Sequence, residues 1–184
     1  MKYNTSGVRQ WTKTFGAATA TVQTVGISMD ESGNIYLAGY VDRALHGETL
    51  TGVSDVFIIK YDSAGSRVWT KLLGTAGTTV TPKSLDVNDS GEICVAGDTN
   101  GALDGNALTG SQDAFVTRFD TSGTKQWTKL LGVAAGITYG EAVTFDGQGG
   151  CYIAGMTNGN LDGETKTGSN DYYITLFNSA GVKQ

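Results

Sequence analysis

A tryptophan motif recurs along this chain at a fixed interval of 58 residues. The tripeptide Trp-Thr-Lys begins at Trp11, Trp69 and Trp127, with no insertion or deletion between the copies. A sequence that repeats at a constant period folds into similar units, and each unit buries its apolar face against its neighbours. We therefore expect residues 1–184 to form one continuous array rather than several independent domains.

Each repeat reads as four short strands joined in two hairpins. In the second repeat, residues 83–88 alternate apolar and polar side chains, and residues 92–97 form an apolar run rich in β-branched residues. After a long loop, residues 113–120 turn back into residues 125–132. Both turns follow the pattern Asp/Asn-x-x-Gly, in which the side chain accepts a backbone N–H and the glycine adopts a positive φ.

Four antiparallel strands repeated in series are typical of the blades of a β-propeller, so the predicted fold class is all-β. The 27 glycines among 184 residues, about twice the usual ~7%, suit many tight turns. A parallel β-helix is the runner-up, but its coils are shorter and lack paired hairpin turns. The predicted units are residues 1–15 as a closing outer strand, 24–73 and 82–131 as two four-stranded blades, and 140–184 as three strands of a third blade.

The second hairpin and its neighbours resemble the bacterial SBBP family of β-propeller repeats. The stretches are GISMDESGNIYLAG (26–39), DVFIIKYDSAGSRVWTKLLG (55–74) and DAFVTRFDTSGTKQWTKLLG (113–132). The resemblance implies that the GISMD-type strand is innermost in each blade and the tryptophan strand outermost. It also implies a bacterial protein that is secreted or at the cell surface, without a general catalytic signature. The N-terminal residues lack the apolar core of a signal peptide, so the localisation stays open.

The first ten residues, MKYNTSGVRQ, restate the last ten, TLFNSAGVKQ, so the repeat frame is cut inside a unit. Three blades fall below the ~4–8 of known propellers, and open strand edges favour association. We predict a head-to-tail homodimer in which residues 11–15 of each copy complete the third blade of the other, giving a six-bladed ring. A homotrimer of nine blades and a piece of a longer propeller are the alternatives. The predicted closure and packing residues are Trp11, Phe15, Trp69 and Trp127.

The long loop within each repeat carries the only acidic cluster with a regular position. Oxygen ligands in a glycine-containing loop suit calcium, so a calcium- or glycan-binding module is the alternative function. Its candidate ligands are Asp104, Asp113, Asp162, Glu164 and Asp171. The first repeat has His46 at the position of Asp104, which weakens this interpretation. We expect the last aspartate of each loop to accept backbone N–H bonds, and we predict no other metal or cofactor.

The remaining features argue against several classes of function. The net charge is −5 and the cations are scattered, so we expect no nucleic-acid partner, and no apolar run reaches the ~20 residues that span a bilayer. His46, the sole histidine, is expected to be a solvated loop residue, and a hydrolase using Asp86 in the central channel ranks third. We expect Cys94 and Cys151 to be separate buried thiols, because they do not coincide in the repeat frame. The predicted function is a non-enzymatic, self-assembling scaffold or interaction module.

Overall fold

The computed structural model describes residues 1–184 and contains only strands, turns and loops. No helix capable of crossing a bilayer occurs in it. The strands are β1 (Lys2–Tyr3), β2 (Arg9–Trp11), β3 (Val22–Met29), β4 (Ile35–Val41), β5 (Asp55–Tyr61), β6 (Arg67–Leu73), β7 (Val80–Val87), β8 (Ile93–Thr99), β9 (Asp113–Phe119), β10 (Lys125–Leu131), β11 (Thr138–Phe145), β12 (Cys151–Thr157) and β13 (Asp171–Phe177).

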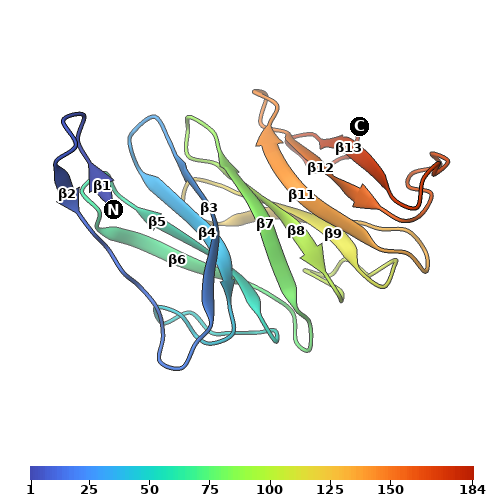
Figure 1. The fold of residues 1–184 in the computed structure, drawn as a ribbon, viewed down its shortest axis with the longest axis horizontal. Helices are drawn as coiled ribbons and strands as arrows, with labels where there is room; N and C mark the ends of the chain where they lie inside the picture. Colours follow the sequence, from blue (N-terminus) through green and yellow to red (C-terminus); the bar gives the residue numbers. More distant parts are fainter.

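These strands form three antiparallel sheets and one short hairpin. The first sheet has the order β3-β4-β5-β6, the second sheet β7-β8-β9-β10 and the third sheet β11-β12-β13, whereas β1 pairs only with β2. The sheets stand in a row, with the β1–β2 hairpin at one end and the third sheet at the other (Figure 1). The prediction of an all-β fold built from blade-like antiparallel sheets is confirmed. The two termini lie at opposite ends of the row.

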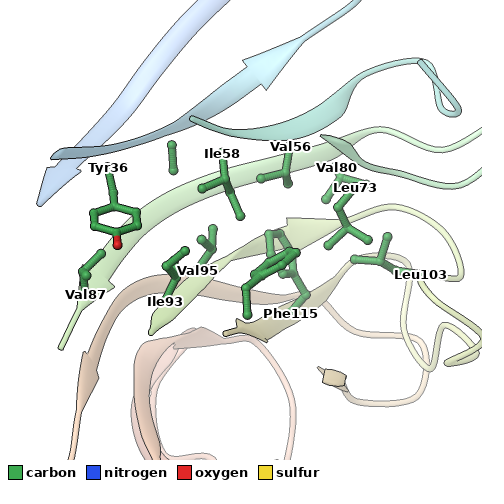
Figure 2. Close-up of a cluster of buried hydrophobic side chains, with 12 residues drawn as sticks. Tyr36, Val56, Ile58, Leu73, Val80, Val87, Ile93, Val95, Leu103 and Phe115 are labelled. Carbon is green, nitrogen blue, oxygen red and sulfur yellow. The ribbon is translucent and has the colours of Figure 1, made fainter. Parts of the chain in front are cut away.

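The sheets stack face to face, and their innermost strands β3, β7 and β11 are neighbours. Apolar side chains of both sheets fill the space between the first and second sheets, where Tyr36 and Ile58 face Ile93 and Phe115 (Figure 2). A second cluster, which includes Val116 and other apolar side chains of both sheets, fills the space between the second and third sheets. Because each sheet contributes to the core on both of its faces, a sheet at the end of the row lacks a neighbouring sheet on one face. On the first sheet, the segment that contains Phe15 and Ala20 covers part of this face and packs against the buried Phe57.

The hairpin turns have the predicted side-chain capping. The carboxylate of Asp120 accepts the backbone N–H groups of Ser122 and Thr124 at 2.9 and 3.0 Å. Gly123 closes this turn with a φ of 78°, a conformation that glycine adopts without steric cost. Asp62 caps the equivalent turn of the first sheet in the same way. The prediction for the turn residues is therefore confirmed.

The two cysteines are not the separate thiols that the repeat frame led us to expect. Cys94 of β8 and Cys151 of β12 form a disulfide between the second and third sheets, and both are fully buried. The expectation was wrong because a shift of 58 residues compares residues at the same position of the repeat. The contact between two neighbouring sheets instead joins residues at different positions of the repeat. The corresponding pair between the first and second sheets is Tyr36 and Ile93, which share an apolar cluster.

Candidate interaction interface

The third sheet lacks the outer strand that the other two sheets have. Beside its edge strand β13 the structure has a cavity of about 360 Å³, lined by the strand, by the loop before it and by Gln184. Three of the predicted loop acids line it, namely Asp162, Glu164 and Asp171. In the second sheet, β10 lies in the equivalent place. The cavity is thus the position of a missing outer strand.

The second sheet shows how an outer strand is held at that position. The side-chain amide of Asn106 donates to the carbonyl of Thr128 on β10 at 3.1 Å. The hydroxyl of Thr117 on β9 donates to the carbonyl of Trp127 at 3.1 Å. Loop and edge strand therefore both contact the outer strand, in addition to the backbone ladder between β9 and β10.

In the first and second sheets, the last aspartate of the long loop packs against a glycine at the end of the outer strand. Asp113 accepts the N–H groups of Thr109 and Gly110 at 2.7 and 2.9 Å, as we expected from the sequence. A Cβ atom on Gly132 would lie only 1.9 Å from the carboxylate of Asp113. Asp55 and Gly74 repeat this relationship in the first sheet, with a corresponding distance of 1.8 Å.

Asp171, the corresponding aspartate of the third sheet, has the same loop contacts but no outer-strand glycine against it. It accepts the N–H groups of Thr167 and Gly168 at 2.7 and 2.8 Å, and these hydrogen bonds hold its pKa below the usual value. The glycine that corresponds to Gly132 in the repeat frame and precedes the first sheet is Gly16, which has no atom within 4 Å of where its Cβ would be. Asp171 and Gly16, which correspond to Asp113 and Gly132, thus lie near opposite ends of the chain.

The other loop acids contact the start of the outer strand or solvent. Asp104 forms an ion pair with Lys125, and Asp162 forms the equivalent pair with Lys183. Glu164 is exposed. The structure contains no group of three or more His, Cys, Asp or Glu side chains placed to hold a metal ion. A calcium or glycan site at these loops stays a prediction.

His46 is half-buried rather than solvated, so that expectation was wrong. Its Nδ1 lies 2.8 Å from the hydroxyl of Thr70, and its ring lies 5.9 Å from the ring of Phe15. Burial and the nearby guanidinium of Arg67 lower the pKa of His46. Its φ of 56° matches the 54° of Asp104, so the first loop keeps the shape of the others without their ion pair.

The opposite end of the row has a complementary feature, an outer strand without a sheet. The indole of Trp11 packs on Gly65 in the second hairpin turn of the first sheet, where a Cβ would lie 2.8 Å from the ring. Trp69 packs on Gly123 and Trp127 on Gly181 in the same manner. Trp11 therefore sits on the first sheet as the outer strand of a preceding sheet would. The sequence predicted a packing role for these tryptophans but missed their glycine partners in the next unit.

A cavity of about 610 Å³ lies between this hairpin and the exposed face of the first sheet. Phe15 and Leu37 are among its mostly apolar lining residues. Two further lining residues, Ile27 and Met29 on β3, are 70% and 63% exposed. Val87, the equivalent of Met29 in the second sheet, is only 8% exposed because the first sheet covers it.

The third sheet exposes the matching face. Tyr172 and Ile174 on β13 are 84% and 71% exposed, whereas their equivalents in the first sheet, Val56 and Ile58, are buried against the second sheet. Tyr152 on β12 is likewise exposed, although its equivalent Tyr36 is fully buried. One end of the row thus presents the face that receives a neighbouring sheet, and the other end presents the face that such a neighbour supplies.

Asp86, the acid of the hydrolase hypothesis, links two innermost strands. Its carboxylate accepts hydrogen bonds from the hydroxyl of Thr144 and the backbone N–H of Phe145, both at 2.9 Å. The equivalent residue in the first sheet is Ser28. In the structure, therefore, Asp86 helps to fasten β7 to β11.

A buried acid between the second and third sheets was not predicted from the sequence. Asp98 at the end of β8 is 3% exposed, accepts a hydrogen bond from the side chain of Gln112 and lies 3.9 Å from the ammonium of Lys83. Its Oδ1 receives no hydrogen bond. Burial raises the pKa of Asp98, and the nearby carboxylate of Glu141 adds to this, while Lys83 and Gln112 oppose it. Tyr40 and Met156 take this position in the other units, so only a comparison of repeats could have drawn attention to it.

The comparisons with known proteins agree with this architecture. The model of the SBBP family, described as a beta-propeller repeat, matches residues 10–40 and 126–162, which confirms the resemblance noted in the sequence. The chain is 34% identical over 171 residues to the regulatory protein FlaEY of Caulobacter vibrioides, covering 83% of this chain and 18% of that protein. It is 26% identical over 182 residues to an uncharacterized WD repeat-containing protein of Acanthamoeba polyphaga mimivirus, covering 72% of this chain and 13% of that protein. The chain thus spans less than a fifth of either relative.

Proposed function

We propose that this chain, which carries SBBP-type β-propeller repeats, is a non-catalytic protein-interaction module that closes into a ring by pairing head to tail with a second copy. Two copies would supply six sheets, within the ~4–8 of known propellers. The observation that carries the proposal is the complementarity of the two ends of the row. One end has an outer strand without a sheet, and the other has a sheet without an outer strand.

The uncovered faces support this arrangement. The side chains of Tyr152, Tyr172 and Ile174 are exposed at positions whose equivalents are buried between the first and second sheets. Seated on Ile27 and Met29 of a second copy, they would make the same kind of contact that Tyr36 and its neighbours make within the chain. Large exposed apolar patches are uncommon on soluble proteins unless a partner covers them.

The backbone ladder of the second sheet gives the register of the proposed strand exchange. In that sheet Trp127 pairs with Arg118, and Leu131 pairs with Ala114. Shifted by the repeat length, the same register places Trp11 of one copy opposite Leu176 of another, and Phe15 opposite Tyr172. It also places Gly16 against Asp171, as Gly132 lies against Asp113.

The comparisons support the coarser part of the proposal. One relative is named a regulatory protein and the other a WD repeat-containing protein, and propellers of this kind offer rigid surfaces for other proteins. Because the chain matches only a small part of each relative, the activities and partners of those whole proteins do not transfer to it.

The mass of the assembly in solution tests the ring. We expect light scattering after size-exclusion chromatography to give twice the chain mass of 19.2 kDa. A folded species with the mass of one chain at micromolar concentration would contradict the proposal. A species of three chains, which would hold nine sheets, would contradict the six-sheet ring and favour the trimer.

A further inference from the structure

The chain contains two copies of one turn, and they compete for one place in the proposed ring. Asn4 accepts the backbone N–H groups of Ser6 and Val8 at 3.1 and 2.9 Å. Asn178, which lies three repeats further along, accepts those of Ala180 and Val182, both at 3.0 Å. The segments MKYNTSGVRQ (1–10) and TLFNSAGVKQ (175–184) therefore share a local fold as well as a sequence pattern.

The β1–β2 hairpin occupies the end of the first sheet in the way that a preceding sheet would (Figure 1). The ammonium of Lys2 donates to the carbonyl of Ser63 at 2.9 Å. Between the second and third sheets, Arg118 donates to the carbonyl of Ser179 at 3.4 Å from the equivalent position. In the proposed ring, the end of β13 from a second copy would occupy this site beside Ser63. Residues 1–8 and that segment cannot occupy it together.

The C-terminal segment is the better anchored of the two. β13 pairs with β12 at seven positions from Asp171 to Phe177, and Phe177 is buried. The indole of Trp127 donates to the carbonyl of Ser179 at 3.0 Å, and Lys183 is paired with Asp162. Residues 1–10 are all exposed by contrast, and β1 pairs only with β2. Displacement of residues 1–8 therefore costs less than displacement of the end of β13.

An unpaired donor marks the hairpin as an imperfect occupant. Trp11 Nε1 is buried and has no hydrogen-bond acceptor, although its equivalent in Trp127 has one. The corresponding acceptor would be the carbonyl of Ser63, which receives only the ammonium of Lys2, whereas the carbonyl of Ser179 accepts from both Arg118 and Trp127. A buried donor without a partner destabilises the state that contains it.

We propose that residues 1–8 are an intramolecular competitor that covers the receiving end of the row until the third sheet of a second copy displaces them. This inference rests on the proposed ring. On assembly, the turn at Asn178 of a second copy replaces the turn at Asn4, which is less well anchored. Residues 1–8 therefore determine the concentration at which rings form, although they are not part of the contact between the two copies in the ring.

Two matched substitutions test this, because the same chemical change at equivalent positions has opposite expected effects. Asn4→Ala removes two hydrogen bonds from the competitor and should lower the dissociation constant of the ring about fivefold. Asn178→Ala weakens the segment that belongs in the seam and should raise the constant by about the same factor. Removal of residues 1–8, with residues 9–184 retained, should lower it about tenfold or more. Sedimentation velocity over a dilution series measures all four chains, and thermal unfolding verifies that each is folded.

The outcomes separate this inference from the proposed function. If the full chain forms the ring and removal of residues 1–8 leaves its dissociation constant unchanged or raises it, the competitor is refuted while the ring stands. If the shortened chain associates and the full chain does not, the competitor is supported, whereas the ring of the full chain is refuted. If neither chain associates, the ring and the competitor fail together.

Discussion

Cys94 and Cys151 join two neighbouring sheets through a disulfide, with their Cα atoms 6.5 Å apart. The bond spans a sequence separation of 57 residues, close to one repeat. Between the first and second sheets the equivalent residues, Tyr36 and Ile93, pack through apolar contacts alone. The same two positions of the repeat therefore meet at successive interfaces, once through a covalent bond and once through packing.

Loss of this disulfide should destabilise the chain without changing its fold. A cross-link that closes a loop of this length restricts the unfolded chain and typically contributes about 2–4 kcal/mol. We expect the double variant Cys94→Ala with Cys151→Ala to lose about that free energy of unfolding in urea titrations. The oxidised wild-type chain should lose it as well after reduction in denaturant, whereas the variant should not respond to reductant. Identical urea midpoints for oxidised and reduced wild type would refute this role.

Three equivalent glycines should respond differently to alanine, depending on whether their aspartate lies in the same chain. Gly132→Ala would place a methyl group 1.9 Å from the carboxylate of Asp113, so we expect a loss of about 1–3 kcal/mol of stability as loop and strand move apart. Gly74→Ala should behave in the same way against Asp55.

Gly16→Ala is the informative member of this set. Nothing lies within 4 Å of the new methyl group in the single chain, so the stability of the isolated chain should be almost unchanged. In the ring the methyl group would meet Asp171 of the second copy, and the dissociation constant should rise about tenfold or more. Melting temperature and dimer dissociation, measured on the same samples, separate the two effects. Equal loss of stability in all three variants would contradict the assignment of Gly16 to the seam.

Asp98 should make stability depend on pH in the direction opposite to most aspartates. Its pKa in the folded chain is raised, so the folded state binds the proton more tightly than the unfolded state, and its contribution to stability increases as pH falls. We expect Asp98→Asn to be more stable than wild type at pH 7, with the difference shrinking toward pH 4.5. Asp171→Asn is the control, because the lowered pKa of Asp171 predicts a loss of stability that is the same at pH 7 and at pH 4.5, both above the unfolded value of 3.8. Urea titrations at both pH values check the two signs.

His46 offers a second test of pH dependence, in which the stability of the folded chain falls as the pH falls. Its pKa is lowered in the folded chain, so its contribution to stability is complete above the unfolded value of about 6.5 and is lost as pH falls below that. His46→Asp restores the residue type of the other loops next to Arg67, and should stabilise the chain by ~0.5 kcal/mol at pH 7.5 and by more at pH 5.5. Parallel pH profiles of the variant and the wild type would show that His46 does not titrate as described. Asp104→His, the reverse change in the second sheet, should introduce the same loss in acid.

The fold followed from the sequence because the repeat supplies the same local signals in every unit. The spacing of Trp11, Trp69 and Trp127 identified the units, and the Asp/Asn-x-x-Gly turns located the hairpins of the sheets. Local hydrogen bonds of this kind involve neighbours along the chain, so residue type and spacing are sufficient to predict them.

The contacts between sheets were not predictable in the same way. Each of them joins one position of the repeat to a different position in the neighbouring unit, as the Cys94–Cys151 disulfide and the packing of Trp127 on Gly181 show. Asp98 was missed for a related reason, since its burial depends on how closely β11 approaches β8. A prediction of such contacts needs the offset between neighbouring sheets, which is a property of their packing rather than of the repeat.

An engineered disulfide across the seam tests the ring most directly. Cys94 and Cys151 correspond in the repeat frame to Tyr152 at the third sheet and Ile35 at the first sheet, so head-to-tail pairing would bring residues 35 and 152 of two copies together as the native cysteines come together within one. We predict that the double variant Ile35→Cys with Tyr152→Cys oxidises to a covalent dimer of two chains, while each single variant does not cross-link. A double variant that stays monomeric on a non-reducing gel, or that forms a ladder of longer polymers, would contradict the closed ring of two chains.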